Sequence, residues 1–282
     1  MLNVLKPPQK PIISKGCSQT RSGFLEKITT SIASNNEAEI FAAQELRHRV
    51  FVKEFGAKVS FKDNNKNIER DRFDRYCDHL ILIDKWSKKC NDTPEIVGTM
   101  RLMQSGVARK SIGFYCATEY YLEKLTTQYE KSLEVGRACV DKHYRGNTAI
   151  HFLWLGLAEY VMLRKITLIF GVASFQGTDI SKYSSALTFL SNNFSAPKNL
   201  NFRAKESGYV NMNIVPLNLL DRVLALSQMP SLLKAYLRMG GLVGDGAFVD
   251  TKFNTIDVGL MVNTDSLNNK YKDYYDRSVK KT

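Results

Sequence analysis

The chain has 282 residues, 44% of them hydrophobic and 24% charged, which is the composition of an ordinary globular protein. Its 40 lysine and arginine residues exceed its 28 aspartate and glutamate residues, and the formal net charge of +12 favours acidic partners: nucleic acid, an anionic membrane surface or an acidic protein. The five cysteines are odd in number and show no CxxC spacing, so they indicate neither a disulfide framework nor a zinc site. A reducing cytosol fits them best.

The first 35 residues contain lysine and proline but no apolar stretch of secretory length, which predicts a flexible basic tail rather than a signal peptide. No run reaches the roughly 18 apolar residues that would span a bilayer. The longest, ITLIFGVASF from Ile166, has the length and β-branched content of a strand. We therefore expect a cytoplasmic protein whose contact with the inner face of the cytoplasmic membrane, if it has one, is peripheral.

Regular hydrophobic periodicity begins at residue 37 and continues to about residue 262. The first predicted elements are a helix over 37–56 that ends at Gly56, a polar connection over 62–78, and strands 79–84 and 95–103 with a turn between them. The later ones are helix 117–125, strand 133–140, helix 147–164, strand 166–173, helix 179–191, an apolar helical stretch over 215–241, and strands 244–250 and 257–262. This order predicts an α/β (α+β) fold with a mixed sheet flanked by helices, in a single domain over 36–282.

The stretch LEVGRACVDKHYRGNTA at 133–149 combines a strand, a basic glycine turn and a helix start. In a regular strand Glu134 shares a face with two small residues, Gly136 and Ala138, while Arg137 points the other way. A bulge at Gly136 would turn Arg137 to the side of Glu134. The helix start that follows is suited to receiving a phosphate group.

Four segments give this order of elements a family resemblance: ELRHRVF at 45–51, ERDRFD at 69–74, IVGTMRLM at 96–103 and LEVGRACV at 133–140. They resemble the acyl-homoserine-lactone synthases, which have the GNAT acyltransferase fold. The sequence is more similar to the ornithine N-acyltransferases of bacterial ornithine-lipid synthesis, which share the segment YLRMGGLVGDGAFVDTKFNTIDV at 236–258. Ala57 stands where the lactone synthases usually have tryptophan, which weakens the lactone interpretation.

The resemblance implies a GNAT-like sheet with a helical and strand extension from about residue 210. It implies transfer of a 3-hydroxyacyl chain from acyl carrier protein to the α-amine of L-ornithine, forming lyso-ornithine lipid, with no metal and no further cofactor. Two alternatives stay open: an acyl-homoserine-lactone synthase, and a non-catalytic basic module that binds membrane or carrier protein. The sequence contains no nucleic-acid-binding motif, so we expect no nucleic acid among the partners.

The resemblance also assigns site residues. Glu134 is the expected catalytic base, because attack on a thioester needs a neutral amine. Substrate binding is assigned to Arg47, Phe51, Asp71, Asp74, Arg101 and Arg137. The alternative for Glu134 is a structural ion pair with Arg101.

The turn YRGNTAI supplies the residues expected to bind phosphopantetheine, namely Arg145, Gly146, Asn147 and Thr148. Members that use acetyl-CoA have more glycine here, whereas Thr148 and Ile150 crowd the turn. A crowded turn suits the single phosphate of a carrier-protein arm better than the pyrophosphate of CoA. Acyl carrier proteins are acidic, which gives the net positive charge a use. The alternative is a purely structural turn.

The C-terminal part carries further candidates. The segment 217–239 either lies on anionic lipid or packs in the core. Asp257, near Asp245 and Asp250, is assigned to substrate binding because it could hold the side-chain ammonium of the amino acid; solvated turns are the alternative. A buried strand position is the favoured interpretation of Cys139, rather than a nucleophile paired with His143.

Overall fold

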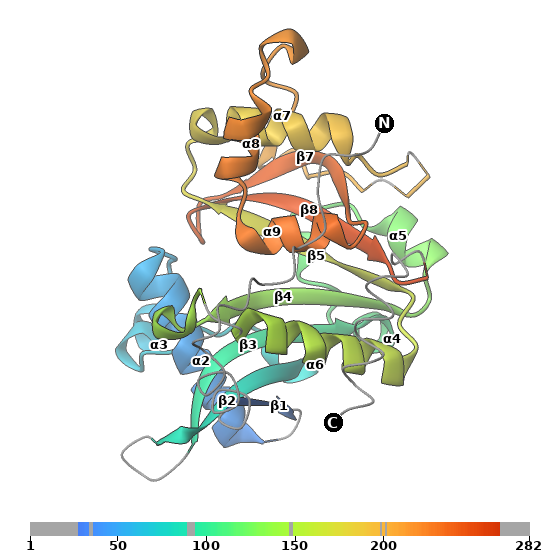
Figure 1. Ribbon diagram of the computed structural model, residues 1–282. Helices are drawn as coiled ribbons and strands as arrows, with labels where there is room; N and C mark the ends of the chain where they lie inside the picture. The colour runs from blue at the N-terminus through green and yellow to red at the C-terminus, as the bar shows by residue number, and fades with distance from the viewer. Residues whose placement is uncertain are drawn as a thin grey trace, which may run out of the picture.

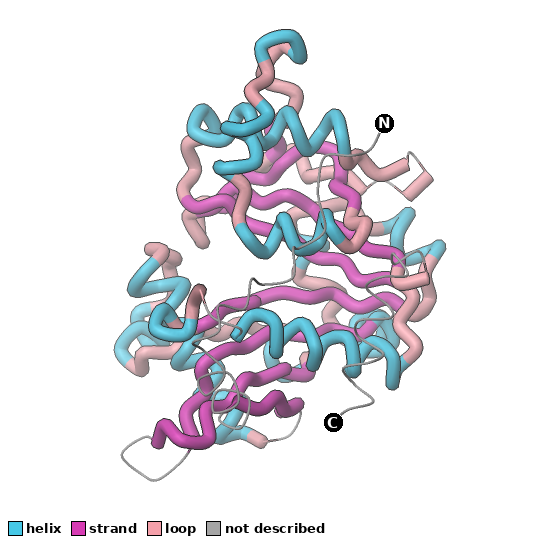
Figure 2. The backbone as a smooth tube through the Cα atoms, viewed as in Figure 1, coloured by secondary structure: helices cyan, strands magenta, loops and turns pink. Residues whose placement is uncertain are grey.

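The computed structural model describes residues 28–33, 36–88, 94–146, 149–197, 199–200 and 202–265. These residues form one mixed eight-stranded sheet in the order β1-β2-β3-β4-β5-β8-β7-β6 (Figures 1 and 2). The strands are β1 (Ile28–Ala33), β2 (Asp78–Lys88), β3 (Pro94–Gln104), β4 (Ser132–Val140), β5 (Leu168–Gln176), β6 (Tyr209–Val210), β7 (Leu242–Asp250) and β8 (Thr255–Asn263). The predicted mixed sheet is confirmed, and the C-terminal extension completes it, because β8 pairs with β5.

Helices cover both faces of this sheet. They are α2 (Glu37–Arg47), α3 (Phe61–Asn65), α4 (Ser105–Lys110), α5 (Glu123–Gln128), α6 (Ala149–Arg164), α7 (Ser184–Asn193), α8 (Arg222–Gln228) and α9 (Ser231–Arg238). Along β2, Leu80 and Leu82 pack in one cluster with Leu153 of α6, whereas Ile81 packs in another with Leu46 of α2. Successive strand residues face opposite sides, so α2 and α6 lie on opposite faces.

Several predicted boundaries shift. The helix predicted over 37–56 is α2 followed by a π-helical stretch, η1 (His48–Glu54), and the chain then turns at Gly56 with a φ of 78°. Where a helix was predicted over 117–125, the chain forms a 3-10 turn, η3 (Cys116–Thr118), and then α5. The prediction that residues 1–35 form a tail is wrong for 28–33, because ITTSIA pairs with β2 as strand β1. The remainder of that tail lies outside the described residues.

Strands β4 and β5 separate soon after they meet. Their parallel pairing begins at Ser132↔Leu168 and ends at Glu134↔Phe170. Both strands continue beyond this point within the described residues, but they no longer pair with each other. At the parting point Gly171 lies so close to β4 that an added Cβ would be 2.3 Å from the carbonyl oxygen of Val135. The two halves of the sheet therefore diverge from Glu134 onward, as Figure 1 shows, and a space forms between them.

The segment predicted to be either membrane-bound or core is buried in one part and exposed in another. Helix α9 buries Leu233, Tyr236 and Leu237, and the Tyr236 ring packs edge-on against Trp154 of α6 at a centroid distance of 4.7 Å. The preceding chain instead exposes a group of large apolar side chains, which we call the apolar tip: Ile214, Leu217, Leu219, Val223 and Leu224. No helix in the described part of the chain is both long and apolar enough to cross a bilayer.

Candidate active site

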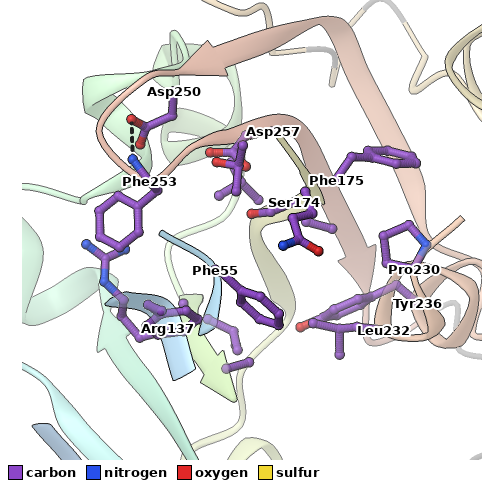
Figure 3. Close-up of a pocket in the computed structure, with 18 of the residues that line it drawn as sticks. Phe55, Arg137, Ser174, Phe175, Pro230, Leu232, Tyr236, Asp250, Phe253 and Asp257 are labelled. Atoms are coloured by element: carbon purple, nitrogen blue, oxygen red, sulfur yellow. Dashed lines mark hydrogen bonds between the residues drawn. The ribbon is translucent and has the colours of Figure 1, made fainter. Parts of the chain in front are cut away.

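A cavity of about 430 Å³ occupies the space between β4 and β5. Residues 134–138 of β4 form one wall and residues 172–176 of β5 form another (Figure 3). Apolar side chains close much of the rest: Phe51, Phe55, Pro230, Leu232, Tyr236 and Phe253. Polar groups enter from two sides, with Glu134 and Arg137 on β4 and Asp250 and Asp257 on the β7–β8 hairpin. A largely apolar cavity with a few convergent polar groups is the usual form of a small-molecule site.

Strand β4 contains a bulge, which lies one position beyond the Gly136 considered from the sequence and brings two polar side chains together. Thr99 of β3 pairs with Cys139, but Arg101 pairs with Gly136, so two β4 residues lie opposite one β3 residue. Arg137, rather than Gly136, takes the left-handed conformation, with a φ of 50°. Arg137 therefore faces the same cavity as Glu134.

Arg137 belongs to a set of six charged side chains that we call the buried ion network: Arg47, Glu69, Asp71, Asp74, Arg101 and Arg137. Asp74 is its centre. Its oxygens accept hydrogen bonds from Arg47 Nη1 and Nη2 at 2.8 Å and from Arg101 Nη1 at 2.9 Å. Three positive and three negative groups balance, so the network as a whole is neutral.

The network holds the Arg137 guanidinium in place. Its Nε lies 3.4 Å from Glu69 Oε1 and its Nη2 lies 3.0 Å from Asp71 Oδ2. The rings of Tyr115 and Phe253 cover it on two sides, with centroids 4.3 and 4.2 Å from its central carbon. Among the described residues that line the cavity, Arg137 is the one cation.

Backbone N–H groups, rather than an ion pair, anchor Glu134. Its Oε1 accepts the backbone N–H of Cys116 at 2.6 Å, and its Oε2 accepts that of Tyr115 at 2.9 Å. Arg101 instead pairs with Asp71 and Asp74, so the structural ion pair with Glu134, the alternative considered from the sequence, does not form among the described residues. Burial raises the pKa of Glu134, although Arg101 and the two backbone N–H groups oppose this. A carboxylate with a raised pKa in a cavity is a candidate general base.

The remaining predicted site residues fall into three groups. Phe51 and Asp257 line the cavity, and Asp71 lines a neighbouring outer cleft of about 590 Å³. The prediction of direct substrate contact is wrong for Arg47, Asp74 and Arg101, which are at most 5% exposed and line neither space. The charged groups of these three residues form ion pairs inside the fold.

Of the four residues predicted to bind phosphopantetheine, the structure describes Arg145 and Gly146. Asn147 and Thr148 lie outside the described residues, and Gly146 turns the chain with a φ of 78° just before α6. Arg145 pairs with Glu54, with Nη2 2.8 Å from Oε2, and lies over the Phe55 ring. Its guanidinium is therefore tied to the end of η1 and about one third exposed.

Sequence reasoning missed Glu69, Glu119 and Tyr115. Glu69 stands within the quoted ERDRFD segment, so its acidic neighbours were a signal that could have found it. Glu119 and Tyr115 lie in an irregular stretch with no motif. Cys139 is buried, and burial raises the pKa of its thiol to about 12, which makes it a poor nucleophile.

Comparison with known proteins agrees with this geometry. A family model described as an acetyltransferase (GNAT) domain matches residues 46–155, and together with the curated relatives it shows that the chain is an acyltransferase of the GNAT class. Among curated proteins, the L-ornithine N(alpha)-acyltransferase of Rhodobacter capsulatus is 43% identical over 241 residues, which are 86% of this chain and 92% of that protein. The enzyme of the same name from Brucella abortus is 38% identical over 244 residues, 86% of each protein. The chain belongs to the L-ornithine N(alpha)-acyltransferase family.

Solved structures match the chain at much lower identity. FeeM, an N-acyl amino acid synthase from uncultured soil microbes, is 9% identical with a TM-score of 0.48, and the match covers 85% of this chain and 92% of that one. The CoA-dependent acyl-homoserine lactone synthase BjaI is 14% identical with a TM-score of 0.48, over 89% of this chain and 88% of that one.

The centre of the buried ion network gives a stability prediction. Burial alone would raise the pKa of Asp74, but Arg47 and Arg101 outweigh it and hold that pKa well below the ordinary value. A depressed folded-state pKa stabilises the fold at neutral pH, and this stabilisation is lost as the pH falls below about 4. We expect Asp74→Asn to cost on the order of 3 to 5 kcal/mol at pH 7, because two buried guanidinium groups lose their charge partner.

The measurement is urea unfolding at several pH values. The difference between wild type and Asp74→Asn should shrink as the pH falls from 7 to 3. The control is Asp245→Asn, which removes the half-exposed pair with Arg203 and should cost no more than about 1 kcal/mol. Equal, small losses for the two variants would contradict the structural importance of the network.

Proposed function

We propose that the protein transfers an acyl chain from acyl carrier protein to the α-amine of L-ornithine, forming a lyso-ornithine lipid. The observation that carries the proposal is the cavity between the diverging strands, which has an apolar wall, the carboxylate of Glu134 and a second acidic side. The printed names of the curated relatives support ornithine as the acceptor. The 3-hydroxy group on the acyl chain rests on the family resemblance alone.

Different parts of the cavity wall suit the apolar and the polar parts of the substrates. The aromatic and aliphatic side chains around Phe51, Leu232 and Tyr236 suit the acyl chain. Beyond Glu134, β4 and β5 no longer pair with each other. The backbone N–H and C=O groups on their facing edges can therefore form hydrogen bonds with the amides of a phosphopantetheine arm. Arg137 lines the cavity and has N–H donors beyond those used by Glu69 and Asp71, and these are proposed to bind the α-carboxylate of the amino acid. This arrangement leaves the α-amine near Glu134.

Glu134 is proposed to take a proton from the α-ammonium before attack. The neutral amine attacks the thioester carbonyl, a C–N bond forms and the C–S bond breaks, and the carrier-protein thiolate leaves and is reprotonated. Each carboxylate oxygen of Glu134 accepts one backbone N–H and retains capacity for another donor.

Acyl carrier protein is the proposed donor because the turn before α6 is poor in glycine and the chain is strongly basic. Incubation with acyl carrier protein thioesters and L-ornithine, L-lysine or L-arginine, followed by mass spectrometry, should give N-acyl-ornithine as the main product. A homoserine lactone product from S-adenosylmethionine would favour the lactone synthase. Binding of carrier protein without turnover of any thioester would favour the non-catalytic module.

Salt dependence separates the two donors. Rising ionic strength screens exposed charges, with a Debye length of about 8 Å near 0.15 M salt. We expect the KM for acyl carrier protein to rise with salt while kcat stays nearly constant, because steering acts on encounter. A higher kcat/KM with acyl-CoA than with the matching carrier-protein thioester would contradict this donor assignment.

The general base has its own test. Glu134→Gln should lower kcat by roughly 10²- to 10⁴-fold, because an amide cannot accept the proton. The wild-type rate should fall on the acid side with an apparent pKa above that of an ordinary glutamate, and this limb should vanish in the variant. An amide also accepts only one of the two backbone N–H groups, so unfolding free energy should drop by about 1 to 3 kcal/mol.

Measuring both properties separates chemistry from anchoring. If Glu134 only holds residues 115 and 116, the folded variant keeps near-normal turnover and retains the acid limb despite its lower stability. That result would end the assignment of Glu134 as general base.

Peripheral membrane contact through the apolar tip is a further part of the proposal. Leu217, Leu219 and Val223 are 61 to 79% exposed, and the segment carries Arg222 for anionic headgroups. A long-chain product suits release at a membrane.

Vesicle flotation tests this contact. Binding to vesicles that contain phosphatidylglycerol should weaken roughly tenfold or more in Leu219→Ser/Val223→Ser, because two apolar side chains no longer leave water. The control is Leu163→Ser, an equally exposed leucine on α6, which should bind like wild type. Equal binding by all three proteins would refute the tip as the contact site.

A further inference from the structure

Three carboxylates from separate segments meet beside the cavity: Glu119 after η3, Asp250 at the end of β7 and Asp257 in β8. One oxygen of each lies within 4.8 Å of the others. We call these three residues the carboxylate cluster. Asp257 lines the cavity, Glu119 lines the outer cleft and Asp250 lines both, so the cluster lies where the two spaces adjoin. Figure 3 shows Asp250 and Asp257 converging from the hairpin.

Two members of the cluster are buried, and three of its oxygens lack a hydrogen-bond donor within the described structure. Glu119 and Asp257 are each 3% exposed. Both side-chain oxygens of Glu119, and Oδ1 of Asp257, have no donor among the described residues. Asp250 uses Oδ1 for the backbone N–H groups of Lys252 and Phe253. Buried carboxylates without partners cost stability, and such groups in native proteins call for a ligand or another explanation.

No positive charge in the described part of the chain neutralises the cluster. The Arg137 guanidinium lowers the pKa of Glu119 and Asp257, but its direct charge pairs are with Glu69 and Asp71. Lys58 and Lys252 line the outer cleft but form no salt bridge with these carboxylates in the described residues. The buried ion network is neutral, whereas this cluster beside it carries only negative groups.

We propose that Glu119, Asp250 and Asp257 bind the side-chain ammonium of the amino-acid acceptor. This inference rests on the proposed function, in which a basic amino acid binds with its α-amine near Glu134. A primary ammonium has three N–H donors, and the cluster offers at least three free acceptor oxygens. Arg137 and the cluster then hold opposite ends of the amino acid, its α-carboxylate and its side-chain nitrogen.

The raised pKa values of the cluster agree with a site for a cation. Burial and the charge of Asp250 together raise the pKa of Asp257 to about 6, against the opposing effect of a hydrogen bond with Ser174. Burial, Asp257 and Asp250 also raise the pKa of Glu119 well above its usual value. The cluster therefore binds protons more readily than ordinary carboxylates do, and a bound ammonium group would favour its ionised form.

Acceptor selectivity tests the site. L-Norvaline has the carbon chain of L-ornithine without the side-chain amine, so the ratio of kcat/KM for the two acceptors isolates the ammonium contact. We expect this ratio to exceed roughly 10² in the wild type, because norvaline would leave buried acceptors unpaired. Glu119→Gln and Asp257→Asn should each lower it at least tenfold.

Controls distinguish binding from folding. Glu123→Gln makes the same change at an exposed position four residues away and should leave the ratio unchanged. The cluster variants should be as thermostable as wild type, or more so, without ligand, because each removes one of several repelling buried charges. An unchanged ratio in both cluster variants would overturn the proposal.

Calorimetry separates this inference from the proposed function. Titration of L-ornithine and L-norvaline into wild type and variants reports binding without turnover. If ornithine binds through the cluster but is not acylated, the proposed function fails and the site stands. If ornithine is acylated with selectivity independent of the cluster, the function stands and the site fails. Tight binding of Mg²⁺ or Ca²⁺ by the cluster, with ornithine turnover abolished by a chelator, would replace the ammonium site with a metal site.

Discussion

The rest of the site depends on the buried ion network. Direct charge pairs join four parts of the chain in this network: α2 through Arg47, the polar connection through its acidic residues, β3 through Arg101 and β4 through Arg137. A left-handed conformation at a non-glycine residue costs on the order of 1 to 3 kcal/mol, and the pairs and ring contacts of Arg137 offset that cost. The network thus fixes the bulge that turns Arg137 into the cavity.

Charge is distributed unevenly around the cavity, and this distribution suggests how the substrates are sorted. The network is neutral, Glu134 is held by backbone N–H groups, and the carboxylate cluster retains unpaired oxygens. Two of the cluster's carboxylates, Asp250 and Asp257, lie on the β7–β8 hairpin (Figure 3), and the third, Glu119, follows η3. A molecule with one carboxylate and two amines complements Arg137, Glu134 and the cluster at the same time.

Sequence reasoning reached the sheet, most of its strands and the bulge in β4, because hydrophobic periodicity and a glycine in a strand are local signals. It missed β1, since ITTSIA carries polar residues at three of six positions and follows a basic tail. It also assigned Arg47 and Asp74 to substrate, although they bind each other across 27 residues of chain. Whether charged residues pair together or face a ligand is set by tertiary geometry. The same limit hid Glu119, which meets Asp257 only after the sheet is complete.

The most direct test of the account is a crystal structure of the protein with bound L-ornithine. The account predicts ornithine in the cavity between β4 and β5, with its side-chain nitrogen within hydrogen-bond distance of Glu119 or Asp257, its α-carboxylate at Arg137 and its α-nitrogen facing Glu134. Ornithine bound with its α-nitrogen at the carboxylate cluster, or bound elsewhere on the molecule, would contradict it.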